Sequence, residues 1–348
     1  MESLPALYGN GITLWIVFAV SVGLAIAIDL GLTGKVRKLL SKQKDEKSDS
    51  SPSEEKQPFK QALMWTIVWI GMAGAFAVLV YVSLGYDKML EFVTGYTLEK
   101  SLSVDNMFVF LLIFTTLAIP HAFQHKVLTV GILSAIAMRI PLILVGVSLL
   151  ESFHWMVYVF GGLLVLTAVK MLLQKKDKKI EVEKNIAVRM LRKVVPVTTE
   201  LNGDKFFTKK NGILFATPLL VALVMVEMTD LVFAIDSIPA ILAITSDPFI
   251  VITSNIFAIL GLRSLYFLLA GMMEKFHYLK PALVALLLFV GFKMIAVDYV
   301  KVPIAISLAV IGGILGIAIG LSYLKAKRQY NHQEKSAIER ATREDAKQ

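Results

Sequence analysis

The sequence predicts an all-α polytopic membrane protein with about nine transmembrane helices, six of which form two inverted three-helix repeats. Three observations lead to this fold class: an apolar composition, basic residues confined to gaps between apolar runs, and charged residues that recur in one order in two halves. Of the 348 residues, 56% are hydrophobic, and the mean hydropathy is +0.68. A soluble core of this length could not bury so much apolar side chain.

Apolar runs long enough to cross a bilayer account for most of the chain. A helix of about 20 residues spans the roughly 30 Å hydrocarbon core. The first run is preceded by no basic residue and followed by no small-residue cleavage site, so we expect a spanning helix there rather than a signal peptide. The predicted helices are 12–32, 62–84, 92–117, 127–150, 155–173, 213–243, 249–272, 281–297 and 302–324.

The positions of the basic residues predict the orientation. Of the 36 Lys and Arg residues, 29 lie in one alternate set of gaps or in the tail after the last run, whereas the opposite gaps hold only Lys88 and Lys301. Cytoplasmic loops carry the excess of Lys and Arg. We therefore expect a plasma or inner membrane protein with its amino terminus outside and its carboxyl terminus in the cytoplasm. The net charge of +9 then requires no nucleic-acid partner.

The organisation follows from these runs. The loop at 174–212 is expected to carry a short interfacial helix near 185–194, with basic residues close to lipid headgroups. The polar, Ser-rich linker is expected to be disordered. The predicted parts are a first helix at 1–33, a cytoplasmic linker at 34–61, a second helix at 62–84, a first repeat at 86–173, a cytoplasmic loop at 174–212, a second repeat at 213–297, a last helix at 302–324 and a tail at 325–348.

Two similar acidic motifs lie inside the predicted spans. A charged residue at a helix centre costs about 2.5 to 3.5 kcal/mol, so these residues must face the bundle interior or one another. "EKSLSVDNMF", from Glu99, aligns with "DLVFAIDSIP", from Asp230. The alignment also matches Asp105 with Asp236, and Asn106 with Ser237.

Downstream of each motif, Arg139 matches Arg263 and Lys170 matches Lys293. Three helices per repeat place the second copy in the opposite orientation, which is an inverted repeat. The arginines are either structural ion-pair partners or coupling charges. The lysines either extend to the nearer membrane interface or share that coupling role.

Helical spacing indicates which acids can act together. Glu99, Ser103 and Asn106 form one stripe, and Asp230, Ala234 and Ser237 form its counterpart. Asp105 and Asp236 lie about 120° around their helices from these stripes. A single ion could therefore reach all four acids only between two helices or where a helix unwinds. The long run at 213–243, which contains Pro218 and Pro239, favours a broken or strongly tilted helix.

The ligand types restrict the cation. Glu227 and Asp230 lie three residues apart, so they place like charges side by side, a device that proton-coupled carriers can use. The chain has no cysteine, and its five histidines lie outside the predicted spans. Carboxylate, amide and hydroxyl oxygens suit Mn²⁺, Mg²⁺ and Ca²⁺. In the alternative interpretation, the acids only neutralise the basic residues.

The motifs "TGYTLEKSLSVDNMFVF" and "VEMTDLVFAIDSIPAILAITSDPF" resemble the paired signatures of the TerC family, a family named for tellurium resistance. Within it they are most similar to the Alx-type manganese exporters, which belong with the LysE-like exporters. The resemblance covers nearly all of 12–324. It implies efflux of Mn²⁺ from the cytoplasm, with a metal site at Glu99, Asp105, Glu227, Asp230 and Asp236. The residues themselves leave Ca²⁺ open as the transported ion and indicate no cofactor. They add Asn106 and Ser237, which follow the second acid of each motif, as oxygen ligands.

Three function classes remain open at this point. The first is a secondary carrier that exports a divalent cation, coupled to protons or to the membrane potential. The second is a non-transporting membrane partner, which delivers metal to secreted enzymes or supports tellurite or stress resistance with other membrane proteins. The third, an intramembrane hydrolase with paired aspartates, lacks the "GxGD" context, so we do not expect an enzyme. No "GxxxxGK[ST]" motif is present, so ATP is not expected to drive transport.

Overall fold

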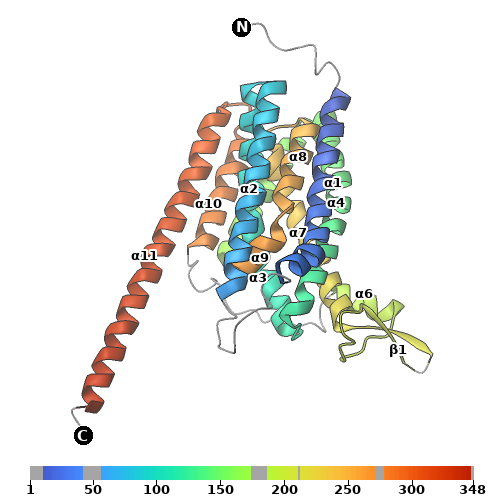
Figure 1. Cartoon of the computed structure of the whole chain (residues 1–348). Coiled ribbons are helices and arrows are strands. Elements are labelled where there is room, and N and C mark those ends of the chain that lie inside the picture. The colour runs from blue at the N-terminus through green and yellow to red at the C-terminus, as the bar shows by residue number, and fades with distance from the viewer. Residues whose placement is uncertain (1–10, 42–55, 174–185, 211, 271–277, 346–348) are drawn as a thin grey trace.

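The computed structural model describes residues 11–41, 56–173, 186–210, 212–270 and 278–345, and these are mostly helical (Figure 1). The strands of one small antiparallel hairpin are β1 (Phe207–Lys210) and β2 (Ile213–Ala216). The helices are α1 (Gly11–Ser41), α2 (Lys56–Leu84), α3 (Tyr86–Thr116), α4 (His121–Ser152), α5 (Met156–Leu173), α6 (Ile186–Val194), α7 (Pro218–Leu242), α8 (Pro248–Ile259), α9 (Leu262–Ala270), α10 (Leu279–Ile295) and α11 (Ile304–Asp345).

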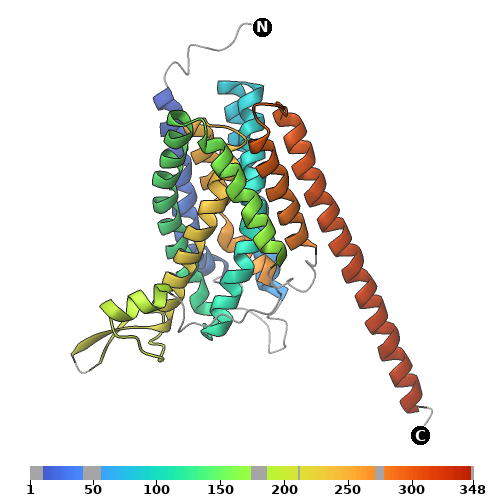
Figure 2. The same ribbon diagram turned by 180° about the vertical axis from the view of Figure 1, so that it is seen from behind.

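The long helices run up and down side by side in one bundle (Figures 1 and 2). We call the end at which α4 and α7 begin the hairpin end, because α6 and the β-hairpin project from it. The other end, where α3 begins and α7 finishes, is the far end. The carboxyl-terminal part of α11 extends well beyond the hairpin end (Figure 1).

Several helices are long and apolar enough to cross a membrane. Among the described residues there are five, and a sixth if α8 and α9, bent by 41° at their junction, count as one span. α10 has only 17 residues, the apolar part of α1 is Ile12–Ile28, and α3 carries charges along its length. The polytopic architecture is therefore clear, whereas nine spans remain a prediction. The five spans are Lys60–Leu84, His121–Ser152, Met156–Leu173, Pro218–Leu242 and Ile304–Ser322.

The outer surface of these helices is apolar, as contact with lipid requires. Large side chains that a soluble protein would bury are more than half exposed, including Ile67, Val78, Val145, Leu166 and Ile317. The interior is also largely apolar, and a smaller set of buried polar and charged residues lies within it.

The two halves of the chain interleave. The most extensive helix pairings are α5 with α10, α3 with α8, and α4 with α7. At the first pairing the backbones approach closely, because a Cβ on Gly161 would lie 2.9 Å from the Gly291 carbonyl oxygen, and one on Gly291 would lie 3.0 Å from that of Gly161. Small residues permit such contact between membrane helices.

Two expectations about helix ends are wrong. α7 does not begin at residue 213 and is not broken. It starts at Pro218, where proline is tolerated because the first helical N–H groups need no intrahelical partner, and it continues past Pro239 to Leu242. Residues 213–216 instead form β2, so the run that seemed too long for one crossing is a strand followed by a helix.

The break lies in the next segment instead. Residues 249–272 were expected as one helix, but α8 and α9 are separated at Gly261, whose φ is +82°. Trp69 of α2 packs against this glycine, and a Cβ there would lie 2.6 Å from the indole ring. Glycine supplies both the left-handed backbone and the space.

The remaining boundaries differ less. The expected short helix near 185–194 is α6, and the all-α prediction missed only the hairpin among the described residues. α1 continues to Ser41 and α2 starts at Lys56, so helix covers both ends of the predicted linker, whose centre lies outside the described residues. The predicted tail continues α11, consistent with its Ala, Lys and Glu content.

Candidate charged site within the bundle

A fully buried arginine joins three helices at the centre of the charged site. Arg139 of α4 is 1% exposed, and its guanidinium donates from Nη2 to Asp230 Oδ1 at 2.8 Å and from Nε to Asp230 Oδ2 at 3.2 Å. Nη1 donates to Glu99 of α3 and, at 3.2 Å, to Asn255 Oδ1 of α8. We call Arg139, Glu99, Asp230 and Asn255 the central network. Its paired carboxylates offset the cost of burying the guanidinium.

Helical spacing explains why these groups meet. Glu99, Ser103 and Asn106 are all buried on α3, and Asp230, Ala234 and Ser237 are all buried on α7. The two stripes thus lie on the interior faces of their helices, as their spacing predicts. Asn255 lies on a segment of α8 that is buried on every side, so its sequence gave no periodic signal.

A third acid, Glu227, lies one turn from the central network. Glu227 precedes Asp230 by three residues on α7, and its Oε1 accepts a 2.6 Å hydrogen bond from Ser134 Oγ of α4. Gly131 makes room for this carboxylate, because a Cβ there would lie 3.2 Å from Oε1. The site therefore contains three carboxylates around one guanidinium.

Several polar atoms of the site have no partner among the described residues. Leaving a buried polar atom without a hydrogen bond costs about 1 to 3 kcal/mol, and more for a charged group. An unpaired set of this kind favours a site that makes further contacts in another state. The atoms are Glu99 Oε2, Ser103 Oγ, Glu227 Oε2, Ser237 Oγ and Asn255 Nδ2.

Asp105 and Asp236 do not join the central network. Both are only partly buried. Asp236 Oδ1 accepts a 2.8 Å hydrogen bond from Thr167 of α5 and interacts electrostatically with Lys170, while Asp105 interacts with Lys280 at the start of α10. Asp236 therefore faces α5 and Asp105 faces α10, rather than each other. We call Asp105 and Asp236 the flanking acids.

The remaining predicted charges have different surroundings. Arg263, aligned with Arg139, donates from Nη1 to Thr129 Oγ1 at 3.1 Å and lies just after the α8–α9 break. Lys170 occupies the last turn of α5, at the hairpin end, and Lys293 the last turn of α10, at the far end. The aligned arginines therefore have unequal roles, whereas the aligned lysines lie at opposite ends.

Lys100 caps the broken helix. Its Nζ lies 3.1 Å from the Ala258 carbonyl oxygen and 3.5 Å from that of Leu260, at the end of α8. A cation is favourable there because the last carbonyls of a helix are unpaired and carry partial negative charge. Lys100 lies within the predicted helix 92–117, but its partners lie about 160 residues away in the chain.

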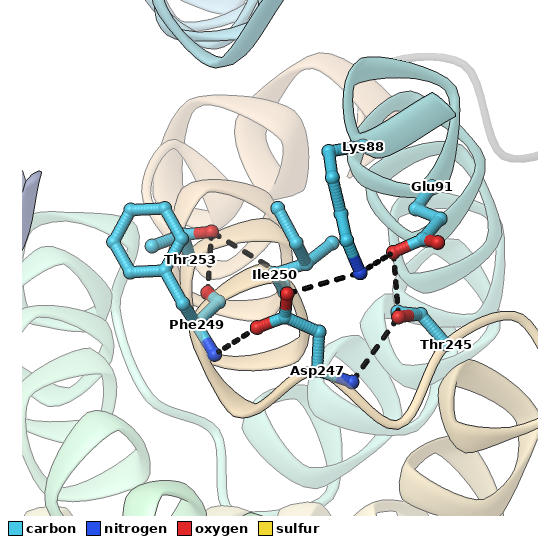
Figure 3. A network of polar contacts seen from close by, with 7 residues as sticks. All are labelled: Lys88, Glu91, Thr245, Asp247, Phe249, Ile250 and Thr253. Atoms are coloured by element: carbon cyan, nitrogen blue, oxygen red, sulfur yellow. Dashed lines mark hydrogen bonds and ion pairs between the residues drawn. The ribbon is translucent and has the colours of Figure 1, made fainter. Parts of the chain in front are cut away.

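A second polar cluster closes the far end (Figure 3). Lys88 Nζ, in the first turn of α3, lies 2.9 Å from Glu91 Oε2 and 3.0 Å from Asp247 Oδ2. Thr245 Oγ1 donates to Glu91 at 2.6 Å and accepts from the Asp247 N–H at 3.1 Å. We call Lys88, Glu91, Thr245 and Asp247 the end latch, because it ties α3 to the α7–α8 turn. Both Lys88 and Asp247 lie in gaps between the predicted spans.

The metal site predicted from the sequence is not assembled in this arrangement. Among the described residues, no three His, Cys, Asp or Glu side chains are placed to hold one ion. The central network brings Glu99 and Asp230 to Arg139, with Glu227 one turn away, whereas the flanking acids are directed elsewhere. The geometry thus separates the five predicted acids into a central group and a flanking pair.

Comparison with known proteins places the chain in a family. Residues 84–330 match the model described as "Integral membrane protein TerC family". The chain is 47% identical over 327 residues to "Uncharacterized membrane protein STKORF319" of Myxococcus xanthus, covering 94% of this chain and 96% of that one. It is 43% identical over 310 residues to "Putative membrane-bound redox modulator Alx" of Escherichia coli K12, covering 87% and 91%. No solved structure matches. With most of its length inside the family match and relatives of this identity, the chain belongs to the TerC family of integral membrane proteins and is of the Alx type.

Proposed function

We propose that the chain is a secondary transporter that exports a divalent cation, Mn²⁺, from the cytoplasm through the central network. The observation that carries this proposal is a buried cation already held by carboxylates from two different helices, Glu99 of α3 and Asp230 of α7. A group of buried acids that can compensate a guanidinium can also compensate a mobile cation. Intramembrane acids of this kind mark ion pathways.

In this proposal Arg139 occupies the site when no cargo is bound. Its guanidinium offsets the charge of Glu99 and Asp230, which could not remain buried and ionised without a cation. A divalent ion would take the same two carboxylates, with the unpaired oxygens of Glu227 and Ser103 as further ligands. Ser237 lies ten residues from Glu227 on the continuous helix α7, about 15 Å along its axis, so it cannot reach the same ion. Arg139 would have to withdraw, so cargo and guanidinium exclude each other.

We further propose that the two halves are inverted repeats. α3 runs from the far end to the hairpin end, and α7 runs the opposite way. The helix pairings are reciprocal: the first helix of each half packs on the second of the other, and α5 packs on α10. A two-fold axis in the membrane plane would produce this exchange, and transporters often bind their cargo where such repeats meet.

The end latch suggests how one side is closed. It joins the start of α3 in the first half to the α7–α8 turn in the second (Figure 3). Rocking of one half against the other would have to break these contacts. With the orientation given by the basic residues, the far end is the outer side, and this arrangement is closed to it.

The printed name of several relatives raises a redox role as a competing function. A thiol–disulfide mechanism cannot be carried by these 348 residues, because none is cysteine. The other competitor is a membrane partner that assists metal supply without moving ions itself. Both alternatives predict no ion flux by the purified chain.

Reconstitution tests the proposal. Purified protein in liposomes should move Mn²⁺ down an imposed gradient, with a matched signal from an internal pH dye if protons are exchanged. Ca²⁺ in the same assay measures the preference between the two ions. The proposal is contradicted if the protein is folded by circular dichroism but the Mn²⁺ flux equals that of protein-free vesicles. The non-transporting role would then be favoured.

A further inference from the structure

A small side domain is fixed to the hairpin end of the bundle. It comprises α6, the connection 195–206 and the β-hairpin, and we call it the side platform. The Ala216 N–H donates to the Pro196 carbonyl at 2.8 Å, and Thr217 Oγ1 donates to the Lys205 carbonyl at 2.8 Å. Lys126 of α4 donates to Asp204 Oδ2 at 2.9 Å and to its carbonyl at 2.7 Å. The side platform thus projects sideways from α4 and α7 in a fixed position (Figures 1 and 2).

Helix α6 divides into three arcs. At about 100° per residue, Ala187, Val188 and Leu191 share one arc. Ala187 is buried, and Val188 and Leu191 pack in the core that contains residues of α7. Ile186, Met190 and Val194 share a second arc, and all three are strongly exposed. Arg189, Arg192 and Lys193 occupy the third. The helix therefore has an apolar face that nothing in the described residues covers, next to a basic face.

The hairpin continues this pattern. Phe207, Lys209 and Leu214 point to one face of the two-stranded ribbon, and the two apolar side chains are exposed. Leu214 is four residues before Pro218, where a candidate membrane span begins, so it lies within about 14 Å of that point. The acids of the connection are Glu200 and Asp204, and Asp204 is already paired with Lys126.

We infer that the side platform lies on the surface of an anionic membrane, with the Ile186, Met190 and Val194 arc inserted among the lipid headgroups. An apolar arc bordered by basic residues, close to the start of a span, is typical of helices that lie in the interface. On the helical wheel Lys193 and Arg189 border the inserted arc, where they meet lipid phosphates, whereas Arg192 lies nearly opposite and faces water. This inference does not depend on transport.

Spin labelling of the whole chain in nanodiscs tests it. The chain has no cysteine, so Met190→Cys and its matched control Arg192→Cys each give a single labelling site on opposite sides of one helix. With phosphatidylglycerol in the nanodisc, the Met190 label should be accessible to oxygen and shielded from a water-soluble nickel chelate. The Arg192 label should be accessible to the chelate.

Charge variants isolate the role of the anionic lipid. Arg189→Gln and Lys193→Gln should each lower the ratio of inserted to water-exposed Met190 label by about fivefold. Arg192→Gln should leave the ratio unchanged. Equal chelate access at both positions would overturn the inference. So would equal insertion in phosphatidylcholine alone, and so would a Met190 label shielded from both reagents, because that label would be covered by protein.

Discussion

Removing the guanidinium of Arg139 should destabilise the fold more than any other single charge neutralisation in the bundle. The side chain is 1% exposed and makes four hydrogen bonds, three of them to carboxylates. Arg139→Gln would leave Glu99 and Asp230 buried without a cation. Breaking a buried ion pair in this way costs about 3 to 5 kcal/mol.

The measurement is thermal unfolding in detergent, followed by tryptophan fluorescence. At about 2.1 cal/mol/K of unfolding entropy per residue over 348 residues, a loss of this size corresponds to an apparent Tm lower by about 4 to 7 °C. Asp230→Asn added to Arg139→Gln should recover part of the loss, because the second change removes one of the uncompensated charges. Arg263→Gln, at the aligned position but only partly buried, is the matched control and should cost less. The reasoning is refuted if Arg139→Gln unfolds at the wild-type temperature, or if the two losses simply add.

Three further predictions concern packing, the end latch and pH. Gly161→Leu should lower the free energy of unfolding by about 1 to 3 kcal/mol, because the new side chain would collide with α10. Gly162→Leu is the control and should have little effect, because no atom lies within 4 Å of its Cβ position. Equal Tm values for the two variants would contradict this packing. Lys88→Gln should speed amide hydrogen exchange at the α7–α8 turn, whereas Asp87→Asn, at the exposed neighbouring position, should not. Unchanged exchange in Lys88→Gln would mean that the end latch does not stabilise this turn. The hydrogen bond from Lys126 holds the pKa of Asp204 below its ordinary value of 3.8. The contact therefore stabilises the side platform fully above pH 3.8, and this stabilisation is lost as the pH falls through the lower pKa of the folded protein. An NMR titration of Asp204 should give that lower value in the wild type and a return toward 3.8 in Lys126→Gln, and identical values would show that Lys126 is not the cause.

Helical periodicity predicted the interior faces well. The stripes of Glu99, Ser103 and Asn106 and of Asp230, Ala234 and Ser237 are buried as their spacing requires, because a long straight helix maps sequence spacing directly onto faces. The membrane character followed from the apolar composition, and the short helix near 185–194 was also expected from the sequence.

The partners of these residues were less accessible to sequence reasoning. Arg139 meets Asp230 across 91 residues and Asn255 across 116, and no local pattern specifies which helices will touch. The break at Gly261 depends on Trp69 from α2, and a glycine in an apolar run gives no warning of it. Pro218 and Pro239, by contrast, suggested a break that α7 does not contain, because one starts the helix and the other lies in its last turn.

The flanking acids show a limit of the repeat argument. Aligning Asp105 with Asp236 matched two carboxylates that are both partly buried, but it could not say that they face α10 and α5 rather than each other. An alignment matches positions in the sequence, whereas contact between those positions depends on how the helices pack.

Calorimetric titration of Mn²⁺ into purified, folded protein tests whether the central network binds the cargo. We expect Asp230→Asn to abolish binding, because it removes a carboxylate that offsets the dehydration of the ion, and the exposed Asp87→Asn to bind like the wild type. Asp105→Asn and Asp236→Asn, tested alongside, show whether the flanking acids are also ligands, as the sequence predicts. Wild-type affinity in Asp230→Asn would contradict the account, and the carboxylates of the central network would then be counter-ions of Arg139 alone.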